Sequence, residues 1–334
     1  MSFEYYLNGN ARRIDEAIAV SIGKGDTDDI WRYLYGPLSE YSANGGKRHR
    51  PLICELACEA VGGDPTLARN SAVAIEHFHT AALIHDDIAD ESTLRRGKPC
   101  MHLTQGEGLA INAGDLALSL VTGSVLKDSQ LADDVKLRVL DELVQMTTRT
   151  IEGQALDIGW ARDARFDLTT DDYLMMAAHK TAYYSGGTPL AVGAIVGGGT
   201  ELQIETLRSF GMASGIAFQI HDDLLNLVGT GEATKKDFRS DITEGKRTLV
   251  AVHALQHSAS SVELKSILAA HTIDEQELAQ AVGIMQSAGS IDYAREYALT
   301  LASEAKRELT EVIPDSNARR LLLSMADFFV DRVG

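Results

Sequence analysis

The stretch HDDIADESTLRRG, residues 85–97, decides how the rest of this chain is interpreted. It places three carboxylates, those of Asp86, Asp87 and Asp90, within five residues at the end of an apolar run. Residues four apart share one face of an α-helix, which puts Asp86 and Asp90 roughly 6 Å apart. Two ionised carboxylates at that separation repel by about 3 kcal/mol at an effective dielectric constant near 20. A hard divalent cation such as Mg²⁺ removes the repulsion, so the pair predicts a metal site.

Two arginines, Arg95 and Arg96, follow the carboxylates directly. Cations beside a metal-binding carboxylate pair indicate a substrate that is itself anionic and metal-bound, such as a diphosphate. The alternative is a solvated acidic helix face, which is the usual role of a lone DDxxD pattern. A second pattern, DDLLN at residues 222–226, ends another apolar helical run. Two such runs favour the metal-site interpretation.

The composition of the 334-residue chain favours helices, because only 6 residues are proline, 45% are hydrophobic and 6% are aromatic. A net charge of −17 argues against nucleic acid as a partner. Three cysteines are too few for a disulfide framework, and we expect Cys54 and Cys58 to pack in the core of a cytoplasmic protein. No apolar run of 18 residues and no signal-type segment is seen, so we expect no membrane span.

Hydrophobic spacing predicts a chain of helices without intervening strands. The expected helices cover residues 11–22, 28–43 with an interruption near Pro37, 52–62, 66–90, 107–127, 133–158, a stretch starting at 171–172, and 201–226. Four or five more follow between residues 249 and 332, and breaks are expected at Gly186–Pro189 and at Gly197–Gly199. We therefore predict an all-α fold: one domain over residues 1–334, a large helical bundle or barrel around a central apolar cavity.

The helix over residues 66–90 carries an apolar stripe of Ile75, Phe78 and Ala82 that ends at Asp86 and Asp90. A pocket lined in this way would hold a charged head at one end and a hydrocarbon tail along the other. His79 lies beside the stripe, where a single histidine on a helix is usually a residue that only packs in the core.

Basic residues gather in two segments. In GGKRHRP, residues 45–51, Lys47 and Arg50 lie next to an expected helix N-terminus, where backbone N–H groups also attract anions. The second segment follows DDLLN and contains Lys236 and Lys246. A solvated basic turn is the alternative for the first, and a charged surface loop for the second.

These motifs resemble those of the trans-isoprenyl diphosphate synthases, the polyprenyl synthetase family. The resemblance runs through nearly the whole chain and rests on several motifs in family order. They are GGKRHRP (45–51), HDDIADESTLRRG (85–97), EGQALD (152–157), KT (180–181), FQIHDDLLN (218–226) and KKDFRSDITEGKRT (235–248). It implies the isoprenoid synthase fold, a homodimer, and a Mg²⁺-dependent prenyltransferase that adds isopentenyl diphosphate to an allylic diphosphate.

The resemblance also implies roles for individual residues. Three Mg²⁺ ions are expected, with Asp86 and Asp90 as ligands of two and Asp222 as a ligand of the third, and with Asp87, Asp223, Asn226 and Asp241 around them. The isopentenyl diphosphate would contact Lys47, Arg50, His79 and Arg96. The allylic diphosphate would contact Arg95, Lys180, Lys236 and Lys246. Lys180, Thr181 and Gln219 would act at the reacting centre.

Two features depart from a generic family member. The second motif ends in Asn226 where the family usually has Asp, which bears on the affinity for the third metal ion. The residues four and five before Asp86 are Ala82 and Ala81, so they leave the chain pocket deep, and Phe78 is the next barrier. We expect geranylgeranyl diphosphate as the product, with farnesyl or longer prenyl diphosphates as alternatives. A terpene cyclase, a non-catalytic partner subunit and a calcium-binding acidic protein are the competing functions.

Overall fold

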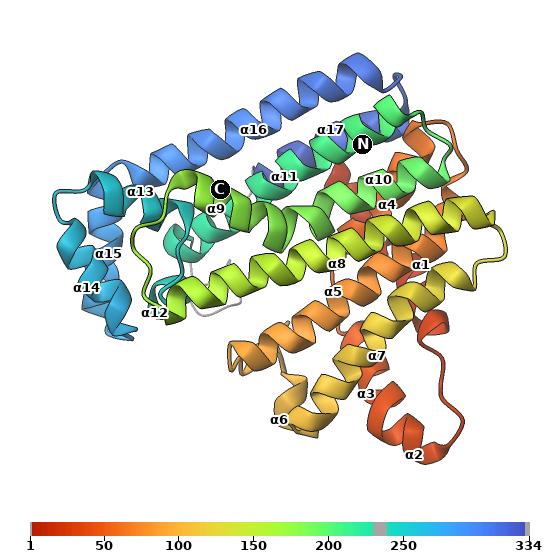
Figure 1. Cartoon of the computed structure of the whole chain (residues 1–334), viewed down its shortest axis with the longest axis horizontal. Helices are drawn as coiled ribbons and strands as arrows, with labels where there is room; N and C mark the ends of the chain where they lie inside the picture. The colour runs from red at the N-terminus through yellow and green to blue at the C-terminus, as the bar shows by residue number, and fades with distance from the viewer. Residues whose placement is uncertain (1, 230–238, 331–334) are drawn as a thin grey trace. The chain divides into compact units, whose positions relative to one another are not determined.

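The computed structural model describes residues 2–229 and 239–330, and these are almost entirely helical (Figure 1). The chain packs into two compact units. Unit 1 comprises Met1–Thr147, Thr188–Arg208 and Thr310–Met325, and unit 2 comprises Thr148–Gly187, Ser209–Leu309 and Ala326–Gly334. The all-α prediction is confirmed, whereas the single domain remains a prediction.

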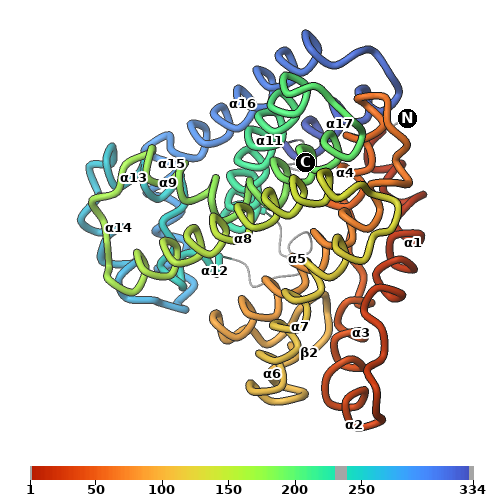
Figure 2. Tube along the Cα trace, turned by 45° about the vertical axis from the view of Figure 1, so that its right-hand side comes forward, coloured from red at the N-terminus to blue at the C-terminus, as the bar shows by residue number. Residues whose placement is uncertain are grey.

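Unit 1 is built from short and long helices and one small hairpin. Its elements are α1 (Phe3–Ile22), α2 (Asp28–Ile30), η1 (Trp31–Tyr35), α3 (Gly36–Ala43), α4 (His49–Ala60), η2 (Pro65–Ala68), α5 (Arg69–Ala89), β1 (Leu94–Arg95), β2 (Lys98–Pro99), α6 (Met101–Gln105), α7 (Glu107–Leu126) and α10 (Thr188–Val196). Helices α5 and α7 lie side by side in the cartoon and in the tube view (Figures 1 and 2), and α4 packs on α10. Cys54 and Cys58 are buried in α4, as predicted.

Unit 2 surrounds a second apolar core. Its elements are α9 (Thr170–Ala177), η3 (Ala178–Gly187), α12 (Ser240–Thr243), α13 (Leu249–His257), α14 (Ser261–Ala270) and α15 (Glu275–Ser287). Four long helices have residues in both units: α8 (Asp133–Arg162), α11 (Glu201–Val228), α16 (Ser290–Val312) and α17 (Asn317–Val330). Tyr173, Ile220 and Leu249 are fully buried in this core. The residues between 249 and 330 form five helices, in agreement with the sequence analysis.

Two expected helix breaks are absent. The expected break at Gly186–Pro189 is wrong, because the chain continues from the π-helix η3 directly into α10. Gly186 serves a close approach instead, since a Cβ there would lie 2.1 Å from the carbonyl oxygen of Gly211 on α11. Near Pro37 the helix widens into the π-turn η1, where Gly36 donates to the carbonyl of Trp31. The wider turn precedes Pro37, which has no N–H to donate to the preceding turn.

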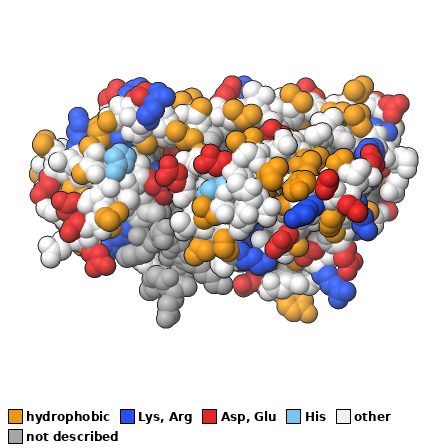
Figure 3. Space-filling view, turned by 90° about the horizontal axis from the view of Figure 1, so that it is seen from below, with side chains coloured by type: hydrophobic (Ala, Val, Ile, Leu, Met, Phe, Trp, Pro, Cys, Tyr) orange, Lys and Arg blue, Asp and Glu red, His pale blue; other side chains and the backbone are white. Residues whose placement is uncertain are grey.

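Helix α7 is long and apolar enough to cross a membrane by length and composition, and it is the only such helix among the residues described. It packs along α5 in unit 1. On the face drawn in Figure 3, acidic and basic side chains are interspersed rather than gathered into one basic patch.

Candidate active site

The first acidic motif lies at the C-terminal end of α5. The backbone N–H of Asp90 donates to the carbonyl of Asp86 at 2.9 Å, so the helical turn extends through both residues as the spacing predicts. Asp86 and Asp90 are half-buried, whereas Asp87 is buried. The motif therefore separates two carboxylates that solvent or ligand can reach from one that packs inside unit 1.

Asp87 is held by three neighbours in the interior of unit 1. Tyr41 on α3 donates its hydroxyl hydrogen to one carboxylate oxygen at 2.8 Å. Arg95 donates its Nε–H to the other at 2.7 Å, and the Cys100 thiol also bonds this carboxylate. The guanidinium of Arg95 lies 3.7 Å from Asp86 as well. Arg95, predicted to bind the allylic diphosphate, is therefore paired with the acidic motif in this structure.

A two-stranded hairpin, absent from the sequence analysis, presents the two arginines. Strands β1 and β2 pair antiparallel with Leu94 opposite Pro99, and the turn residues Arg96 and Gly97 both have positive φ. That combination is the tight type I′ turn that joins adjacent strands. In this hairpin the side chain of Arg95 donates to Asp87, while Arg96 donates to the carbonyl of Gly45 in the GGKRHRP segment.

The basic segment and α5 form a cationic cluster in unit 1. Arg50 is buried in the first turn of α4, and Lys47 is exposed just before it. His79 on α5 is buried, and burial lowers the pKa of its imidazole, with Arg50, Arg96 and His49 lowering it further. The structure thus brings together Arg50, His79 and Arg96, which were predicted to share the isopentenyl-diphosphate site. Clustered cations with a neutral histidine form a site that attracts an anion.

The second acidic motif lies near the end of α11 in unit 2 and repeats the arrangement of the first. Asp222 is exposed and Asp223 is buried. Tyr173 on α9 donates to Asp223 at 2.8 Å, and the Gln219 side chain donates to its other oxygen at 2.7 Å. Thr181 donates to Gln219 at 2.5 Å, so two of the three residues predicted to act at the reacting centre are joined to the motif.

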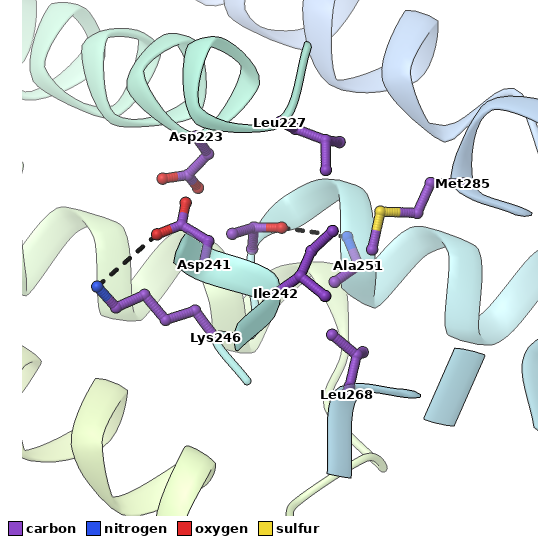
Figure 4. A pocket seen from close by; sticks show the side chains of 9 residues that line it. Asp223, Leu227, Asp241, Ile242, Lys246, Ala251, Leu268 and Met285 are labelled. Carbon is purple, nitrogen blue, oxygen red and sulfur yellow. Dashed lines mark hydrogen bonds and ion pairs between the residues drawn. The ribbon is translucent and has the colours of Figure 1, made fainter. Parts of the chain in front are cut away.

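A small pocket opens beside Asp223, lined by apolar side chains together with Asp223, Asp241, Lys246 and Thr248 (Figure 4). In the figure the carboxylate of Asp223 points from α11 toward that of Asp241 on α12, and Lys246 lies 3.7 Å from Asp241 on the other side. Burial raises the pKa of Asp223, and the charge of Asp241 raises it further. Two carboxylates that disfavour each other's ionisation form a site that a cation would stabilise.

Lys180 pairs with Asp157, a buried residue of the EGQALD segment to which the sequence analysis gave no role. Lys246 also acts electrostatically on Asp157, so two of the lysines predicted to bind the allylic diphosphate interact with one carboxylate. The sequence signal that could have identified Asp157 is its place in the EGQALD motif, which basic residues follow later in the chain. Lys236 lies outside the described residues.

Comparison with known proteins places this fold and these motifs in a family. The polyprenyl synthetase model matches residues 32–285. The chain belongs to the polyprenyl synthetase family. It is 41% identical to a short chain isoprenyl diphosphate synthase of Methanothermobacter thermautotrophicus over 86% of this chain and 87% of that protein. It is 36% identical to a geranylfarnesyl diphosphate synthase of Natronomonas pharaonis, with 86% of each chain covered.

Solved structures agree with this assignment. The geranylgeranyl pyrophosphate synthetase of Pyrococcus horikoshii superposes with a TM-score of 0.90 at 35% identity, covering 99% of this chain and 98% of that one. A geranylgeranyl pyrophosphate synthase of Corynebacterium glutamicum, solved with isoprenyl diphosphate and magnesium, superposes with a TM-score of 0.85 at 28% identity, over 99% and 98% of the two chains. The predicted family and the predicted trans-isoprenyl diphosphate synthase activity are confirmed.

The donors of this polyprenyl synthetase suit magnesium. Among the residues described, no group of three or more His, Cys, Asp or Glu side chains forms a complete metal site. Mg²⁺ normally binds one or two carboxylates and completes its shell with water and substrate phosphate. Half-buried Asp86 and Asp90, one turn apart, and exposed Asp222 meet that requirement, whereas buried Asp87 and Asp223 are committed to tyrosine hydroxyls.

Asn226, the last residue of the DDLLN motif, bonds to the start of α12. Its Nδ2 donates to the hydroxyl oxygen of Ser240 at 3.0 Å, and its Oδ1 accepts from the backbone N–H of Asp241 at 3.2 Å. The backbone carbonyl of Asn226 also accepts from the N–H of Arg239 at 3.1 Å. The Asn226 side chain thus holds the backbone of Asp241, the residue whose carboxylate faces that of Asp223.

The residues predicted to set product length lie on α5 in unit 1 of the synthase. Phe78 is 3% exposed and Ala81 is fully buried, while Ala82 is half-buried. The residues one turn before Asp86 are these two alanines, and Phe78 is the first large side chain farther along this face of α5. Their role in product length stays a prediction.

Proposed function

We propose that this synthase uses magnesium to condense isopentenyl diphosphate with an allylic diphosphate and that geranylgeranyl diphosphate is its main product. The proposal includes three magnesium ions, with Asp86 and Asp90 as ligands of two and Asp222 as a ligand of the third. Two of the structures reported above are of geranylgeranyl diphosphate synthases, which supports this product. The geranylfarnesyl synthase among the relatives makes a longer product the alternative.

Individual residues of the chain would have separate roles in the reaction. Arg95, Lys180 and Lys246 would turn from Asp87, Asp157 and Asp241 to the allylic diphosphate, which offers a stronger anionic partner. Bound magnesium would neutralise the charge that develops on that diphosphate as its C–O bond breaks. The Thr181 hydroxyl and Gln219 carbonyl present oxygen dipoles that would stabilise the positive charge left on the allylic carbon.

The observation that carries the proposal is the cationic cluster of unit 1. Arg50 and Arg96 lie around a buried histidine, and the nearby acidic motif is a separate set of side chains. An enzyme with one diphosphate substrate needs only the metal-bound site. A second site made of cations alone fits a second diphosphate that binds without metal, as isopentenyl diphosphate would.

The direct test supplies radiolabelled isopentenyl diphosphate with Mg²⁺ and, in turn, dimethylallyl, geranyl and farnesyl diphosphate. Products are dephosphorylated and sized by chromatography. We expect labelled geranylgeraniol from each primer and no labelled product in excess EDTA. Hydrocarbon formed from an allylic diphosphate alone would identify a cyclase, and geranylfarnesol as the main product would correct the chain length.

We also propose that the synthase is a cytoplasmic homodimer. Helix α7 supports the dimer, because Ile111 and Leu126 are 45% and 57% exposed on an apolar helix whose other face packs on α5. Covering such side chains with a second copy removes apolar surface from water. Light scattering of the purified protein tests the dimer, and Ile111→Glu together with Leu126→Glu should shift it toward the monomer.

A further inference from the structure

Arg48 lies at the centre of the GGKRHRP segment, yet it does not belong to the exposed cationic surface. It precedes the first residue of α4 and has a φ of 51°, a left-handed conformation that is uncommon for a residue with a side chain. Its side chain is 2% exposed, whereas Lys47 beside it is exposed. The backbone turn at Arg48 therefore sends neighbouring side chains in different directions.

The guanidinium of Arg48 contacts three separate helices. Its Nε donates to Asp15 on α1 at 2.6 Å, and one terminal nitrogen donates to Glu76 on α5 at 2.7 Å. The other terminal nitrogen donates to the backbone carbonyl of Ser42 on α3 at 2.5 Å. Glu76 is itself buried, with a side-chain exposure of 3%. All three nitrogens have protein partners, so Arg48 has no reason to bind substrate.

The contacts of Arg48 surround the cationic cluster. Glu76 lies three residues before His79 on α5, so it occupies the adjacent turn. Ser42 lies just before the loop that carries Gly45, whose carbonyl accepts from Arg96. Arg48 is also one of the charges that lower the pKa of His79. One side chain thus connects the loop, the helix with Arg50 and the helix with His79.

We propose that Arg48 is a positioning residue for isopentenyl diphosphate: its three-way contact with Asp15, Glu76 and Ser42 holds Lys47, Arg50, His79 and Arg96 in one arrangement. The inference rests on the proposed function. Lysine cannot replace it, because a single ammonium cannot reach three helices with the planar fork that arginine provides. A buried pair that loses one partner also leaves an uncompensated charge.

Arg13 gives a matched control. It pairs with Glu55, which is 1% exposed, and so links α1 to α4 through a buried carboxylate as Arg48 links α1 to α5. Glu55 also pairs with Arg69 at 3.1 Å. No bond described joins Arg13 or Arg69 to the cationic cluster. Arg13→Lys therefore tests what loosening a buried ion pair does by itself.

The experiment measures steady-state kinetics of Arg48→Lys, Glu76→Gln and Arg13→Lys, with urea denaturation of each. We expect Arg48→Lys to raise the KM for isopentenyl diphosphate about tenfold, with the KM for the allylic substrate and kcat within about twofold of wild type. Glu76→Gln should raise the same KM by a smaller factor, since it keeps the hydrogen bond without the charge. Arg13→Lys should leave both KM values unchanged.

Calorimetry with inorganic diphosphate in EDTA separates this inference from the proposed function, because it reads metal-free binding without turnover. Wild type and Arg13→Lys should bind, and Arg48→Lys should bind about tenfold more weakly. An unchanged affinity and KM in Arg48→Lys, or an equal rise in Arg13→Lys, would overturn the role of Arg48. Wild type that binds diphosphate but elongates no primer would overturn only the proposed function.

Discussion

The hydroxyl of Tyr41 donates to Asp87 at 2.8 Å, from α3 to α5, and thereby buries the middle carboxylate of the first acidic motif. Tyr173 makes the same bond to Asp223 at 2.8 Å, from α9 to α11. In each motif the second aspartate is anchored inside its own unit, while the first, Asp86 or Asp222, is more accessible. The repeated pattern gives the second aspartate of each motif a structural role and leaves the first accessible.

Replacing Tyr173 with Phe should shift the acid limb of the activity profile to higher pH. The pKa of Asp223 is raised by burial and by Asp241, and the hydrogen bond from Tyr173 opposes that rise. Without the bond the pKa rises further, so the carboxylate takes up its proton at a higher pH. Activity from pH 5 to 8 measures the shift.

The control for this change is Tyr5→Phe on α1, because Tyr5 is 72% exposed. If Tyr173→Phe and Tyr5→Phe gave identical pH profiles, Tyr173 would have no influence on the titration of Asp223.

Tyr41→Phe should lower the free energy of unfolding, measured in urea, by about 1–2 kcal/mol, as expected when a buried carboxylate loses a donor.

Asn226 should act by fixing Asp241 and not as a metal ligand. Asn226→Leu removes both bonds to residues 240 and 241, so the Asp241 amide should exchange with deuterium about tenfold faster or more. Asn226→Asp can accept from both the Ser240 hydroxyl and the Asp241 N–H, so it should keep the slow exchange. Hydrogen exchange read by mass spectrometry measures this.

Magnesium titrations of the same variants separate the two roles. If position 226 only holds Asp241, Asn226→Asp should require nearly the same magnesium concentration as wild type. An apparent magnesium affinity more than tenfold tighter in Asn226→Asp would instead make position 226 a ligand.

The motif helices could be predicted from sequence because their information is local. The spacing of apolar residues predicts the helices α5 and α11, and the acidic motifs lie near the ends of the same helices. Arg48 could not be placed, because its partners Asp15 and Glu76 are 33 and 28 residues away and no spacing rule joins them. The hairpin around Arg96 was missed, since strands of two residues show no periodicity and Arg-Gly is not a typical turn pair.

His77 should make the protein less stable in mild acid. It is fully buried on α5, its Nε2 lies 2.9 Å from the Ser21 hydroxyl, and burial lowers its pKa from 6.5 to about 4. Below pH 6.5 the unfolded chain takes up a proton that the folded chain refuses until about pH 4. The free energy of unfolding should therefore fall by about 3 kcal/mol across this window.

Urea denaturation of wild type and His77→Gln from pH 7 to pH 4 measures this contribution. The variant should lose less stability on acidification than wild type, whatever its stability at pH 7. His257→Gln, at an exposed site on α13, removes only a charge that lowers the pKa of His253, so it should change the slope less than His77→Gln does. Parallel curves for wild type and His77→Gln would assign the acid sensitivity to other groups.

Phe78 should limit product length. It precedes Asp86 by eight residues on α5, which is about 12 Å along the helix axis. Ala81 and Ala82 between them are too small to stop a growing chain, so the aromatic ring is the first obstacle on that helix. Phe78→Ala should yield prenyl diphosphates longer than geranylgeranyl diphosphate, and chromatography of the dephosphorylated products measures their length.

Ile75→Ala supplies the control for that prediction. Ile75 is fully buried on the same helix, three residues farther from Asp86, so its truncation weakens the same core and leaves the ring of Phe78 in place. Each truncation should cost about 2–5 kcal/mol of stability. If the barrier is Phe78, only its own truncation lengthens the product. Equal lengthening in both variants would mean that a loosened core sets product length, and wild-type products from Phe78→Ala would place the barrier on another helix.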